Sequence, residues 1–342
     1  MSAGVAVRVD QPYALSVIDR PEVEAPGAGE ISISVQRAGI CGSDMHILHG
    51  ANPFAVYPRI IGHEFAGTVA AVGSGVEGLS VGTRVVVDPV VACGHCYACR
   101  VGRPNVCANI QVMGVHRDGG FRTQLVVPVA NAIPVQEGTA PEIAALAEPL
   151  SVAANVLSRT GCGREDTVLV YGAGTVGLTV LQVAKMKGAR VIVADRVASR
   201  LEAARRFGAD RVIDSRESDV VAAMRNENDG LGPSVVIDGA GVPALMAEAV
   251  AVASPAGRIG LLGFASEPSS LVQQHVVAKE LSLHGSRLNR RLMPEVLDWI
   301  ARGAINPEAL ITHTFAASDA AAAFRLIEDR PFDTIKVQLA FD

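Results

Sequence analysis

The strongest constraint on the fold is an alternation of short apolar runs and helical segments that begins at residue 167. The runs are rich in Val, Ile and Leu, and Ala-rich or amphipathic segments such as SRLEAARRFG lie between most of them. Six runs fit buried strands: 167–171, 190–194, 211–214, 234–238, 258–263 and 281–285. Strands and helices that alternate in this way are typical of a parallel, doubly wound α/β sheet.

A glycine-rich turn with the pattern G-x-G-x-x-G follows the first of these runs, at Gly172, Gly174 and Gly177. Such glycines let the pyrophosphate of a dinucleotide approach the N-terminus of the next helix. The second run leads to Asp195, an acid that can bind the ribose hydroxyls of NAD and repels the 2′-phosphate of NADP. We therefore predict a Rossmann domain that binds NAD, while the neighbouring Arg196 would favour NADP. The other predicted cofactor contacts are Thr175, Val176 and Arg200.

The remainder of the chain has a different pattern. At 342 residues the chain is long enough for two domains, each with its own core. The segment 31–35 alternates apolar and polar residues, and 65–89 contains short Val-rich runs cut by glycines, which predicts a β-rich first part. A helix is expected from Thr139, with Glu142 as its capping-box partner, and an interruption is expected near Glu148-Pro149. Two helices and a closing strand, TIKVQLAF, follow residue 290.

Four of the six cysteines lie in one short stretch, CGHCYACRVGRPNVC. The spacing C-x2-C-x2-C-x7-C lets thiolates from one loop converge on a single ion, and four sulfurs fill the tetrahedral shell of zinc. We therefore predict a structural zinc site. An iron–sulfur cluster is an alternative, although its usual runs have a different last spacer, and a redox C-x-x-C pair would need only two cysteines. The predicted ligands are Cys93, Cys96, Cys99 and Cys107, with His95 as a spacer.

Composition and charge exclude several classes of protein. The formal charge of −5 is mild and the charges are mixed, so no basic nucleic-acid-binding face is expected. The N-terminus lacks the pattern of a signal peptide, and no apolar run approaches the roughly eighteen residues of a membrane span. We expect a cytoplasmic protein without nucleic-acid or membrane partners, in which clustered cysteines bind metal or act in redox chemistry.

Two further stretches, CGSDMH (41–46) and GHEFAG (62–67), offer Cys41 and His63 beside carboxylates. Taken singly, a buried thiol and a core histidine would explain them. Together with the four-cysteine loop, the AEPL element at 147–150 and the glycine motif, they form a specific combination. Along essentially its full length, the sequence resembles the zinc-dependent medium-chain dehydrogenases, the family of alcohol, sorbitol and threonine dehydrogenases.

This resemblance implies a GroES-like β-barrel catalytic domain built from both chain ends, residues 1–150 and 288–342. A Rossmann domain, residues 151–287, would be inserted between them. The resemblance also implies two zinc ions per subunit, NAD as the cofactor, and a homo-oligomer, for which we expect a tetramer or a dimer.

The family pattern also assigns candidate catalytic residues. Cys41 and His63 would be ligands of a catalytic zinc, and Glu148 lies where the polyol dehydrogenases have a glutamate. Glu64 could exchange into the shell, so which glutamate binds at rest stays open. Three protein ligands would leave the fourth position for a substrate oxygen or water.

Three residues of the first element have family roles beyond metal ligation. Asp44 resembles the acid that orients the zinc-bound histidine. Ser43 and His46 match the family's proton relay, which would carry away the alcohol proton while hydride passes to the nicotinamide. For Ser43 and Asp44 the alternative is a simple turn pair.

The substrate is predicted from finer resemblances. Stretches such as GVHRDGGF and LLGFASEPSSLVQQHVVAKELSLHGSRLN resemble a branch with a starvation-sensing oxidoreductase and the L-galactonate and L-gulonate 5-dehydrogenases. This implies oxidation of a sugar acid, such as L-gulonate or L-galactonate, at C5. The carboxylate would need a cation, for which His116, Arg117 and Arg287 are candidates, although an ordinary surface role explains each of them.

Three alternatives remain open at this stage. A polyol of the sorbitol or galactitol kind, or L-threonine, could be the substrate, and a neutral polyol would need none of the three cations. The chain could also be a sensing or regulatory protein that binds NAD but catalyses no reaction. Loss of Cys41, His63 or Glu148 would favour that reading, and all three are present.

Overall fold

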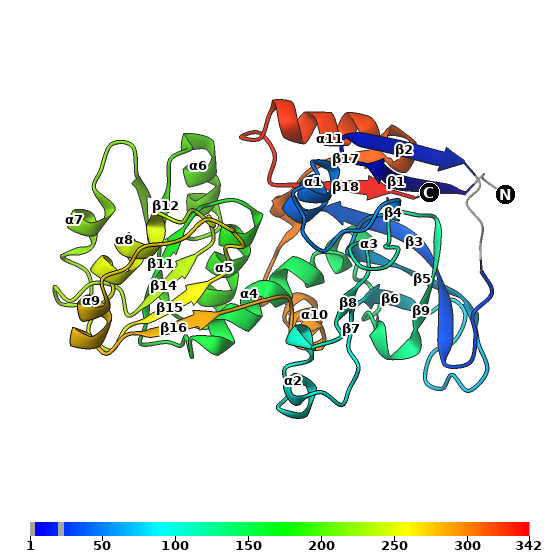
Figure 1. Cartoon of the computed structure of the whole chain (residues 1–342), viewed down its shortest axis with the longest axis horizontal. Helices are drawn as coiled ribbons and strands as arrows, with labels where there is room; N and C mark the ends of the chain where they lie inside the picture. The colour runs from blue at the N-terminus through cyan, green and yellow to red at the C-terminus, as the bar shows by residue number, and fades with distance from the viewer. Residues whose placement is uncertain (1–3, 20–23, 342) are drawn as a thin grey trace. The chain divides into compact units, whose positions relative to one another are not determined.

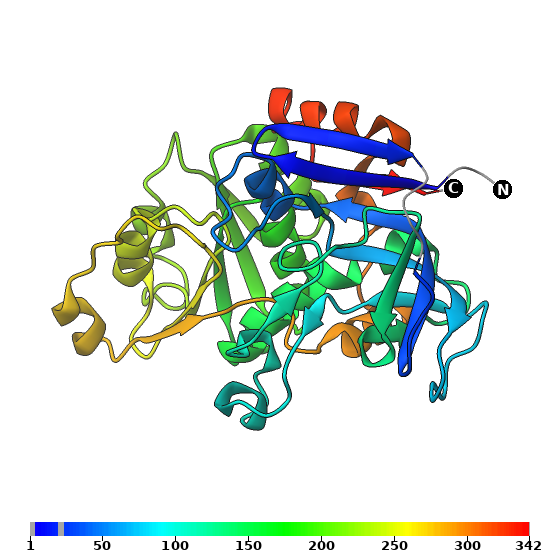
Figure 2. The ribbon, with the colours of Figure 1, turned by 45° about the vertical axis from the view of Figure 1, so that its right-hand side comes forward.

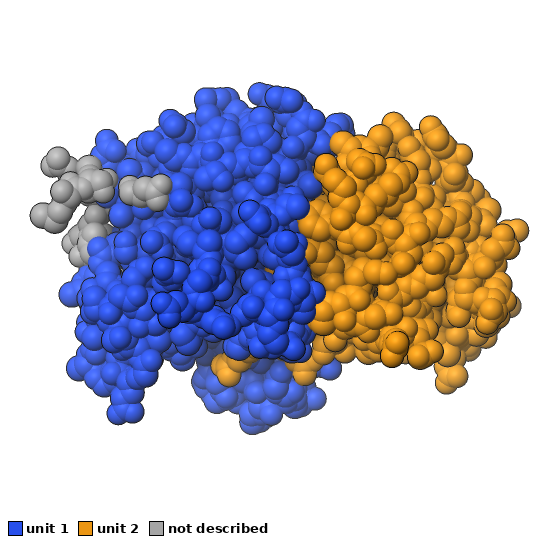
Figure 3. All heavy atoms as spheres, turned by 180° about the vertical axis from the view of Figure 1, so that it is seen from behind, with its two compact units in different colours: residues 1–148, 293–342 blue, residues 149–292 orange. Residues whose placement is uncertain are grey.

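The computed structural model describes residues 4–19 and 24–341 of the chain. The chain forms two compact units, which Figure 3 colours separately. Unit 1 comprises Met1–Glu148 and Met293–Asp342, and unit 2 comprises Pro149–Leu292. Both ends of the chain therefore belong to one unit, and the other unit is a single continuous insertion.

Unit 2 is a six-stranded parallel sheet with the strand order β13-β12-β11-β14-β15-β16, flanked by α5 and α8 on opposite sides (Figure 1). Its strands are β11 (Thr167–Tyr171), β12 (Arg190–Asp195), β13 (Arg211–Asp214), β14 (Val235–Asp238), β15 (Arg258–Leu261) and β16 (Ser282–Gly285). Its helices are α4 (Ala147–Arg159, which begins in unit 1), α5 (Thr175–Met186), α6 (Ala198–Arg206), α7 (Val220–Met224), α8 (Leu245–Val252) and α9 (Gln273–Ala278). The predicted doubly wound α/β fold is confirmed.

The central strands of this sheet are apolar because helices pack against both of their faces. All five residues of β11 are buried, and Leu169 and Tyr171 pack with Ile192, Val236 and Ile259 in one core cluster. A continuous apolar run therefore marks a central strand here. The edge strand β16 has no fully buried residue.

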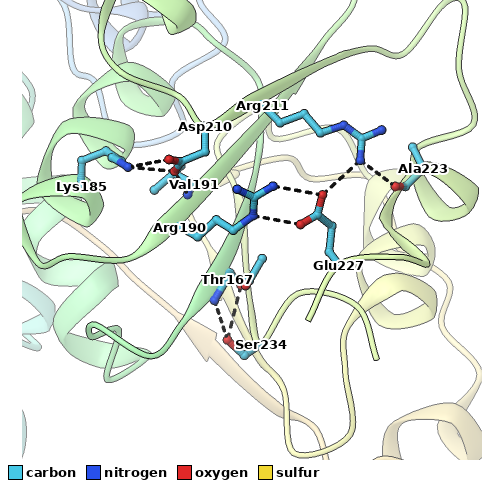
Figure 4. Close-up of polar contacts among 9 residues, drawn as sticks. All are labelled: Thr167, Lys185, Arg190, Val191, Asp210, Arg211, Ala223, Glu227 and Ser234. Atoms are coloured by element: carbon cyan, nitrogen blue, oxygen red, sulfur yellow. Dashed lines mark hydrogen bonds and ion pairs between the residues drawn. The ribbon is translucent and has the colours of Figure 1, made fainter. Parts of the chain in front are cut away.

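A polar network lies at the N-terminal ends of the strands of this sheet (Figure 4). Glu227 accepts from Arg190 at 3.0 Å and from Arg211 at 3.1 Å, at the first residues of β12 and β13. Lys185, at the end of α5, pairs with Asp210 at 2.8 Å. Dinucleotides bind at the C-terminal ends of parallel strands, so we expect this network at the N-terminal ends to stabilise the fold and not to bind the cofactor.

The described residues of unit 1 form three sheets. A seven-stranded sheet runs in the order β10-β6-β5-β3-β18-β17, with β9 also paired to β3, and the smaller sheets are β2-β1-β4 and β7-β8. Helix α11 lies beside β2, as Figures 1 and 2 show. The C-terminal strand β18 pairs with β3 near the start of the chain. The last fifty residues therefore complete the sheet that the first hundred begin.

The longer strands of unit 1 are β1 (Val5–Gln11), β2 (Ala14–Asp19), β3 (Glu30–Ile40), β5 (Glu64–Val72), β6 (Arg84–Val87), β9 (Gln124–Pro128), β17 (Ile311–Ala316) and β18 (Lys336–Ala340). The shorter ones are β4 (Arg59–Ile60), β7 (Val90–Val91), β8 (Gln111–Val112) and β10 (Ala132–Pro134). The α-helices are α1 (Gly42–Leu48), α2 (Tyr97–Arg100), α3 (Pro141–Ala144), α10 (Met293–Ala301) and α11 (Ala320–Asp329). Short 3-10 turns are η1 (Pro104–Val106), η2 (Val129–Asn131), η3 (Glu308–Leu310) and η4 (Ala317–Asp319).

Two local expectations near residue 140 are wrong. The N-cap of α3 is Ala140, without a side-chain cap, so Thr139 and Glu142 form no capping box. The helix breaks between α3 and α4, at residues 145 and 146, and Pro149 lies in the first turn of α4. A proline is tolerated in a first turn because its missing donor would have no partner there. Within the described residues, no helix is long and apolar enough to span a membrane.

Candidate metal centres and cofactor turn

The four predicted cysteine ligands converge in one lobe of unit 1. Their sulfurs lie within 4.8 Å of one another, and Cys107 Sγ is 3.4 Å from that of Cys93 and 3.8 Å from that of Cys96. Zinc–sulfur bonds of about 2.3 Å give a tetrahedron with edges of about 3.8 Å, so the spacing suits zinc. His95 is exposed and its ring contacts the Cys93 carbonyl, outside the sulfur group.

The electrostatics of this lobe also favour a cation. Backbone N–H groups of Ala108 and Cys99 lower the pKa of the Cys96 thiol to about 6. Desolvation and the neighbouring Cys96 sulfur raise the pKa of Cys99 to about 12. Four thiols at this spacing oppose one another's ionisation, and a bound divalent cation would allow all of them to be thiolates.

A second group of candidate ligands assembles in unit 1 from two separate segments. One ligand atom each from Cys41, His63 and Glu64 lie within 4.8 Å of one another. Cys41 is the N-cap of α1, and its N–H donates to Asp44 Oδ2 at 2.9 Å. His63 and Glu64 follow Gly62, whose N–H donates to Asp44 Oδ1 at 3.2 Å. The buried Asp44 carboxylate thereby joins the two ligand segments.

The His63 ring is oriented by two neighbours. Its Nδ1 lies 3.7 Å from Asp44 Oδ1 and its Nε2 lies 3.5 Å from Ser43 Oγ. Burial would lower the pKa of His63, but Asp44 and Cys41 together outweigh it and raise that pKa well above 6.5. With Nδ1 facing the carboxylate, Nε2 is left as the ligand atom for a metal. His46 lies on the same helix as Ser43 and is exposed.

The two glutamates have different surroundings. Glu64 makes a buried ion pair with Lys336, whose Nζ lies 2.8 Å and 2.7 Å from its two carboxylate oxygens. Glu148, in the first turn of α4, is 3% exposed and lies outside the 4.8 Å group. Burial raises the pKa of Glu148 to about 7, and the charge of His63 opposes that rise.

This donor set fits zinc. A thiol, an imidazole and carboxylates are the ligands of catalytic zinc sites, which keep one position open. The buried Nδ1 of His63 makes no hydrogen bond to any described residue, and the carboxylate beside it is the usual partner of a metal-bound imidazole. The sequence patterns did not identify Lys336 as a site residue. A lysine inside the apolar run IKVQLAF nevertheless indicates a buried ammonium group that needs an acidic partner.

In unit 2, the glycine turn lies at the C-terminal end of β11. Gly172 has φ +89°, a conformation that favours glycine, and a Cβ at Gly177 would overlap the backbone of Gly172. Asp195 is buried, and its carboxylate accepts from Ala173 N at 2.6 Å and from Val197 N at 2.8 Å. The acid therefore braces the turn and keeps lone pairs for a ribose. Thr175 and Val176 form the first turn of α5, and Arg200 is half-buried on α6.

The three candidate substrate cations have different surroundings. His116 stacks on Phe54 with ring centroids 5.7 Å apart, and its Nδ1 accepts from Val112 N at 3.1 Å. Arg117 lines a hollow of about 210 Å³ with Arg59 and Arg122. None of the catalytic candidates is among the described residues that line this hollow. Arg287 belongs to unit 2, where its guanidinium lies 6.0 Å from the Phe264 ring centroid.

Comparison with known proteins identifies the family. Residues 27–137 match the alcohol dehydrogenase GroES-like domain, and residues 175–302 match the zinc-binding dehydrogenase domain. The starvation-sensing protein RspB of Escherichia coli K12 is 48% identical over 340 residues, which is 98% of this chain and 99% of RspB. The chain belongs to the zinc-type medium-chain alcohol dehydrogenases. The predicted family, its GroES-like and Rossmann folds and its oxidoreductase class are confirmed.

The chain is also similar to a solved structure and to two dehydrogenases with named substrates. A crystal structure of the rspB protein of Escherichia coli CFT073, in complex with NADH, superposes with a TM-score of 0.95 at 48% identity and covers 100% of each chain. L-Galactonate-5-dehydrogenase of Escherichia coli K12 is 36% identical over 86% of each chain. L-Threonine 3-dehydrogenase of Pyrococcus abyssi is 37% identical over 92% of each chain.

Proposed function

We propose that this dehydrogenase oxidises the secondary alcohol of a sugar acid with NAD, at C5 of a hexonate such as L-gulonate or L-galactonate. One observation carries the proposal. Relatives named for L-galactonate and for L-threonine both act, by those names, on a secondary alcohol in a molecule with a carboxylate. A carboxylate-bearing secondary alcohol is thus the chemistry that the L-galactonate and L-threonine dehydrogenases share.

The site residues supply the parts that such a reaction needs. Cys41 and His63, with one of the two buried glutamates, would hold zinc, and Cys93, Cys96, Cys99 and Cys107 would hold a second, structural ion. A bound catalytic zinc would supply Lewis acidity, which lowers the pKa of an alcohol toward neutrality. Asp44 fixes the direction of the His63 ring, so this ligand needs no reorganisation during the reaction.

Two side chains on α1 offer a route for the alcohol proton. Ser43 Oγ lies 3.5 Å from His63 Nε2, and a hydroxyl there can accept a proton from a substrate and pass one on. His46, three residues further along α1, is exposed and can exchange that proton with water. We assign Ser43 to the substrate end of the relay and His46 to the solvent end.

The cofactor is NAD in this proposal. Asp195 lies at the end of β12, where a carboxylate disfavours a 2′-phosphate. The NADH complex of the rspB protein, which covers the whole chain, supports the same assignment. The glycines Gly172, Gly174 and Gly177 would receive the pyrophosphate at the start of α5, where Gly174 is the N-cap. Gly172 needs a positive φ and Gly177 has no room for a Cβ.

For the carboxylate of the substrate we favour the segment that carries His116 and Arg117. Gly119 N donates to Ile60 O and Gly120 N donates to Gly62 O, each at 2.8 Å, so this segment is tied to the residues that precede His63. Arg287 is a further candidate in unit 2. Arginine suits this task because its fork can bind both carboxylate oxygens.

The test is NADH formation by zinc-replete enzyme with L-gulonate, L-galactonate, L-idonate, sorbitol, galactitol and L-threonine. Turnover confined to the hexonates is expected, and any active substrate is repeated with NADP. A preference for a polyol or for L-threonine would refute the sugar-acid assignment and leave the zinc and NAD assignments intact. Absence of turnover, with NAD binding and both zinc ions demonstrated, would favour a sensing role.

We also propose that the protein is a cytoplasmic homo-oligomer. Strand β16 lies at the edge of its six-stranded sheet, and Leu283 on it and Val277 on α9 are 36% and 69% exposed. A second copy of the chain is the occupant we expect for this edge. Light scattering of the purified protein tests it, and a monomeric mass at micromolar concentration would contradict it.

A further inference from the structure

Three arginines from separate segments of unit 1 line one hollow of about 210 Å³. Arg59 lies on β4, Arg117 on the loop after β8, and Arg122 two residues before β9. All three residues are half-buried, so water solvates their guanidinium groups only in part. Among the described residues that line this hollow there is no candidate ligand of either metal centre. The hollow is therefore a cationic feature separate from both centres.

Two of these arginines have N–H donors for which the described chain holds no acceptor. A guanidinium group has five donors. The side chain of Arg59 is 16% exposed and donates from Nη1 to Asp118 Oδ1 at 2.8 Å, but its Nε has no partner among the described residues. Arg117 makes no side-chain hydrogen bond or ion pair with any described residue. A partly desolvated cation without such partners costs free energy, which a bound anion would offset.

The charges around the hollow favour an anion. Its acids are Asp118 and Glu24, so the three positive charges exceed the two negative ones by one. Asp118 Oδ1 already accepts from Arg59 and, at 3.2 Å, from Ile60 N. Glu24 is exposed, where water and salt screen its charge. An anion beside the guanidinium groups therefore meets more positive than negative charge.

A buried hydroxyl adds a neutral donor to the same hollow. Ser32 is fully buried, and its Oγ accepts from Gln124 Nε2 at 2.6 Å. Its hydroxyl proton has no acceptor among the described residues and remains available to an oxygen in the hollow. Hydroxyl and guanidinium donors together suit an oxyanion.

The size of the hollow limits the class of anion. A volume of about 210 Å³ corresponds to roughly seven water molecules at about 30 Å³ each. That space accepts inorganic phosphate or a short dicarboxylate, and it is below the range of about 300–1,000 Å³ that drug-sized ligands need. Arginine forks bind two oxygens of either kind of anion, so both share the chemistry that these side chains recognise.

We propose that this hollow is an anion-binding site that takes a small dianion, phosphate or a short dicarboxylate, between Arg59, Arg117 and Arg122. The bound anion joins β4, the loop after β8 and the start of β9, and thereby stabilises unit 1. The inference does not depend on which substrate the enzyme oxidises. It leaves His116 and Arg287 as the candidate cations for the carboxylate of the substrate.

The first experiment titrates zinc-replete enzyme that is saturated with NADH, so that the cofactor occupies the glycine turn that phosphate would otherwise enter. Potassium phosphate and succinate are added in separate calorimetric titrations, with potassium chloride at equal ionic strength as the control. We expect one equivalent bound per chain. At ten times its Kd the dianion should raise the unfolding midpoint by about 2–4 °C, and chloride should not. The lower of the two Kd values identifies the class of ligand.

The second experiment places the anion with charge variants. Arg122→Gln should weaken dianion binding at least about tenfold, because one charge-assisted contact is lost. Glu24→Gln removes a negative charge and should tighten binding about twofold, and it keeps the test available if Arg122→Gln does not fold. The matched control is Arg205→Gln on α6, an exposed arginine paired with Glu202 far along the chain, which should leave the Kd unchanged.

Three results would overturn the inference. One is a folded wild-type enzyme that binds neither phosphate nor succinate up to about 50 mM. Another is binding that Arg122→Gln leaves unchanged, which would place the anion at the catalytic metal or another cation. The third is weaker binding in Glu24→Gln, since removal of a negative charge cannot weaken an anion site in this hollow.

Discussion

The two candidate metal centres differ in how the chain builds them. The four-cysteine lobe takes all of its ligands from residues 93–107, and its own turns, α2 and η1, bring the sulfurs together. The candidate catalytic cluster takes Cys41, His63 and Glu64 from two segments, and Glu148 and Lys336 from two more. A site with contiguous ligands depends on its loop, and an assembled site depends on the fold of a whole unit. Damage to the two centres should therefore have different consequences.

The largest expected effect is loss of activity at the assembled site. His63→Ala should lower kcat/KM by at least about 10³-fold, because several kcal/mol of Lewis-acid stabilisation would be lost with the metal. Thermal stability should change far less, since the β3–β5–β18 sheet remains. Initial rates and metal content measure this. The matched control is His95→Ala, an exposed histidine within the cysteine lobe that should leave both unchanged. Retained activity in His63→Ala would show that His63 is not a ligand of the catalytic metal.

The contiguous centre should show the reverse pattern. Cys107→Ser should release the zinc of the lobe and lower the unfolding midpoint, because structural metal binding contributes directly to folding. Activity per correctly folded molecule should persist below that midpoint. Cys162→Ser is the control, since Cys162 is a buried thiol outside the lobe. A Cys107→Ser protein with two zinc ions and the wild-type midpoint would refute a structural role for this ion.

An intermediate effect is expected at the carboxylate that joins the two ligand segments. Asp44→Asn keeps the size of the side chain but removes the charge that faces His63 Nδ1, 3.7 Å away. Catalytic-metal affinity should fall about 10- to 100-fold, as is usual when the partner of a metal-bound histidine is changed. Competition with a chelator measures this affinity. Cys41 N and Gly62 N donate to different oxygens of Asp44, so the single amide oxygen of Asn can keep only one of these contacts. An unchanged affinity would mean that neither the charge nor the second contact contributes to metal binding.

The same contrast explains what could be predicted from the sequence. The six strands of unit 2 and the four-cysteine lobe follow local patterns, a continuous apolar run or a fixed spacing. Lys336 was missed because its partner Glu64 is 272 residues away and meets it only through the pairing of β18 with β3 and β3 with β5. The family resemblance supplied Cys41 and His63 as candidates, but it did not choose between Glu64 and Glu148. That choice depends on side chains that only the fold brings together.

The expected capping box at Thr139 failed for a related reason. Its pattern, Thr139 with Glu142 three residues later, requires α3 to start one residue earlier than it does. The chain instead starts α3 with Pro141 at its first position, which needs no donor. Local capping patterns therefore place a helix to within a residue or two, and the tertiary structure decides the start.

The smallest effect is expected in a cluster of two arginines and a glutamate at the N-terminal ends of the strands of unit 2. Glu227 joins Arg190 and Arg211 there, and both arginines are partly exposed, at 48% and 41% of their side chains. Solvent screens such pairs, so Glu227→Gln should cost only about 0.5–1 kcal/mol of unfolding free energy at neutral pH. The pH dependence gives the sign. Hydrogen bonds from Arg190 lower the pKa of Glu227 below 4.5, so its stabilisation is present above that pH and is lost as the pH falls through the lowered pKa.

Denaturant unfolding of wild type and Glu227→Gln at several pH values tests this, with the difference in free energy expected to shrink below about pH 4. The result matters for the contrast between the two metal centres, because this network is also assembled from distant segments. A small effect here would show that long-range assembly alone does not make a site sensitive, and that burial of charge beside a metal does. A loss above about 3 kcal/mol, the range of a broken buried pair, would instead make assembly itself the deciding property.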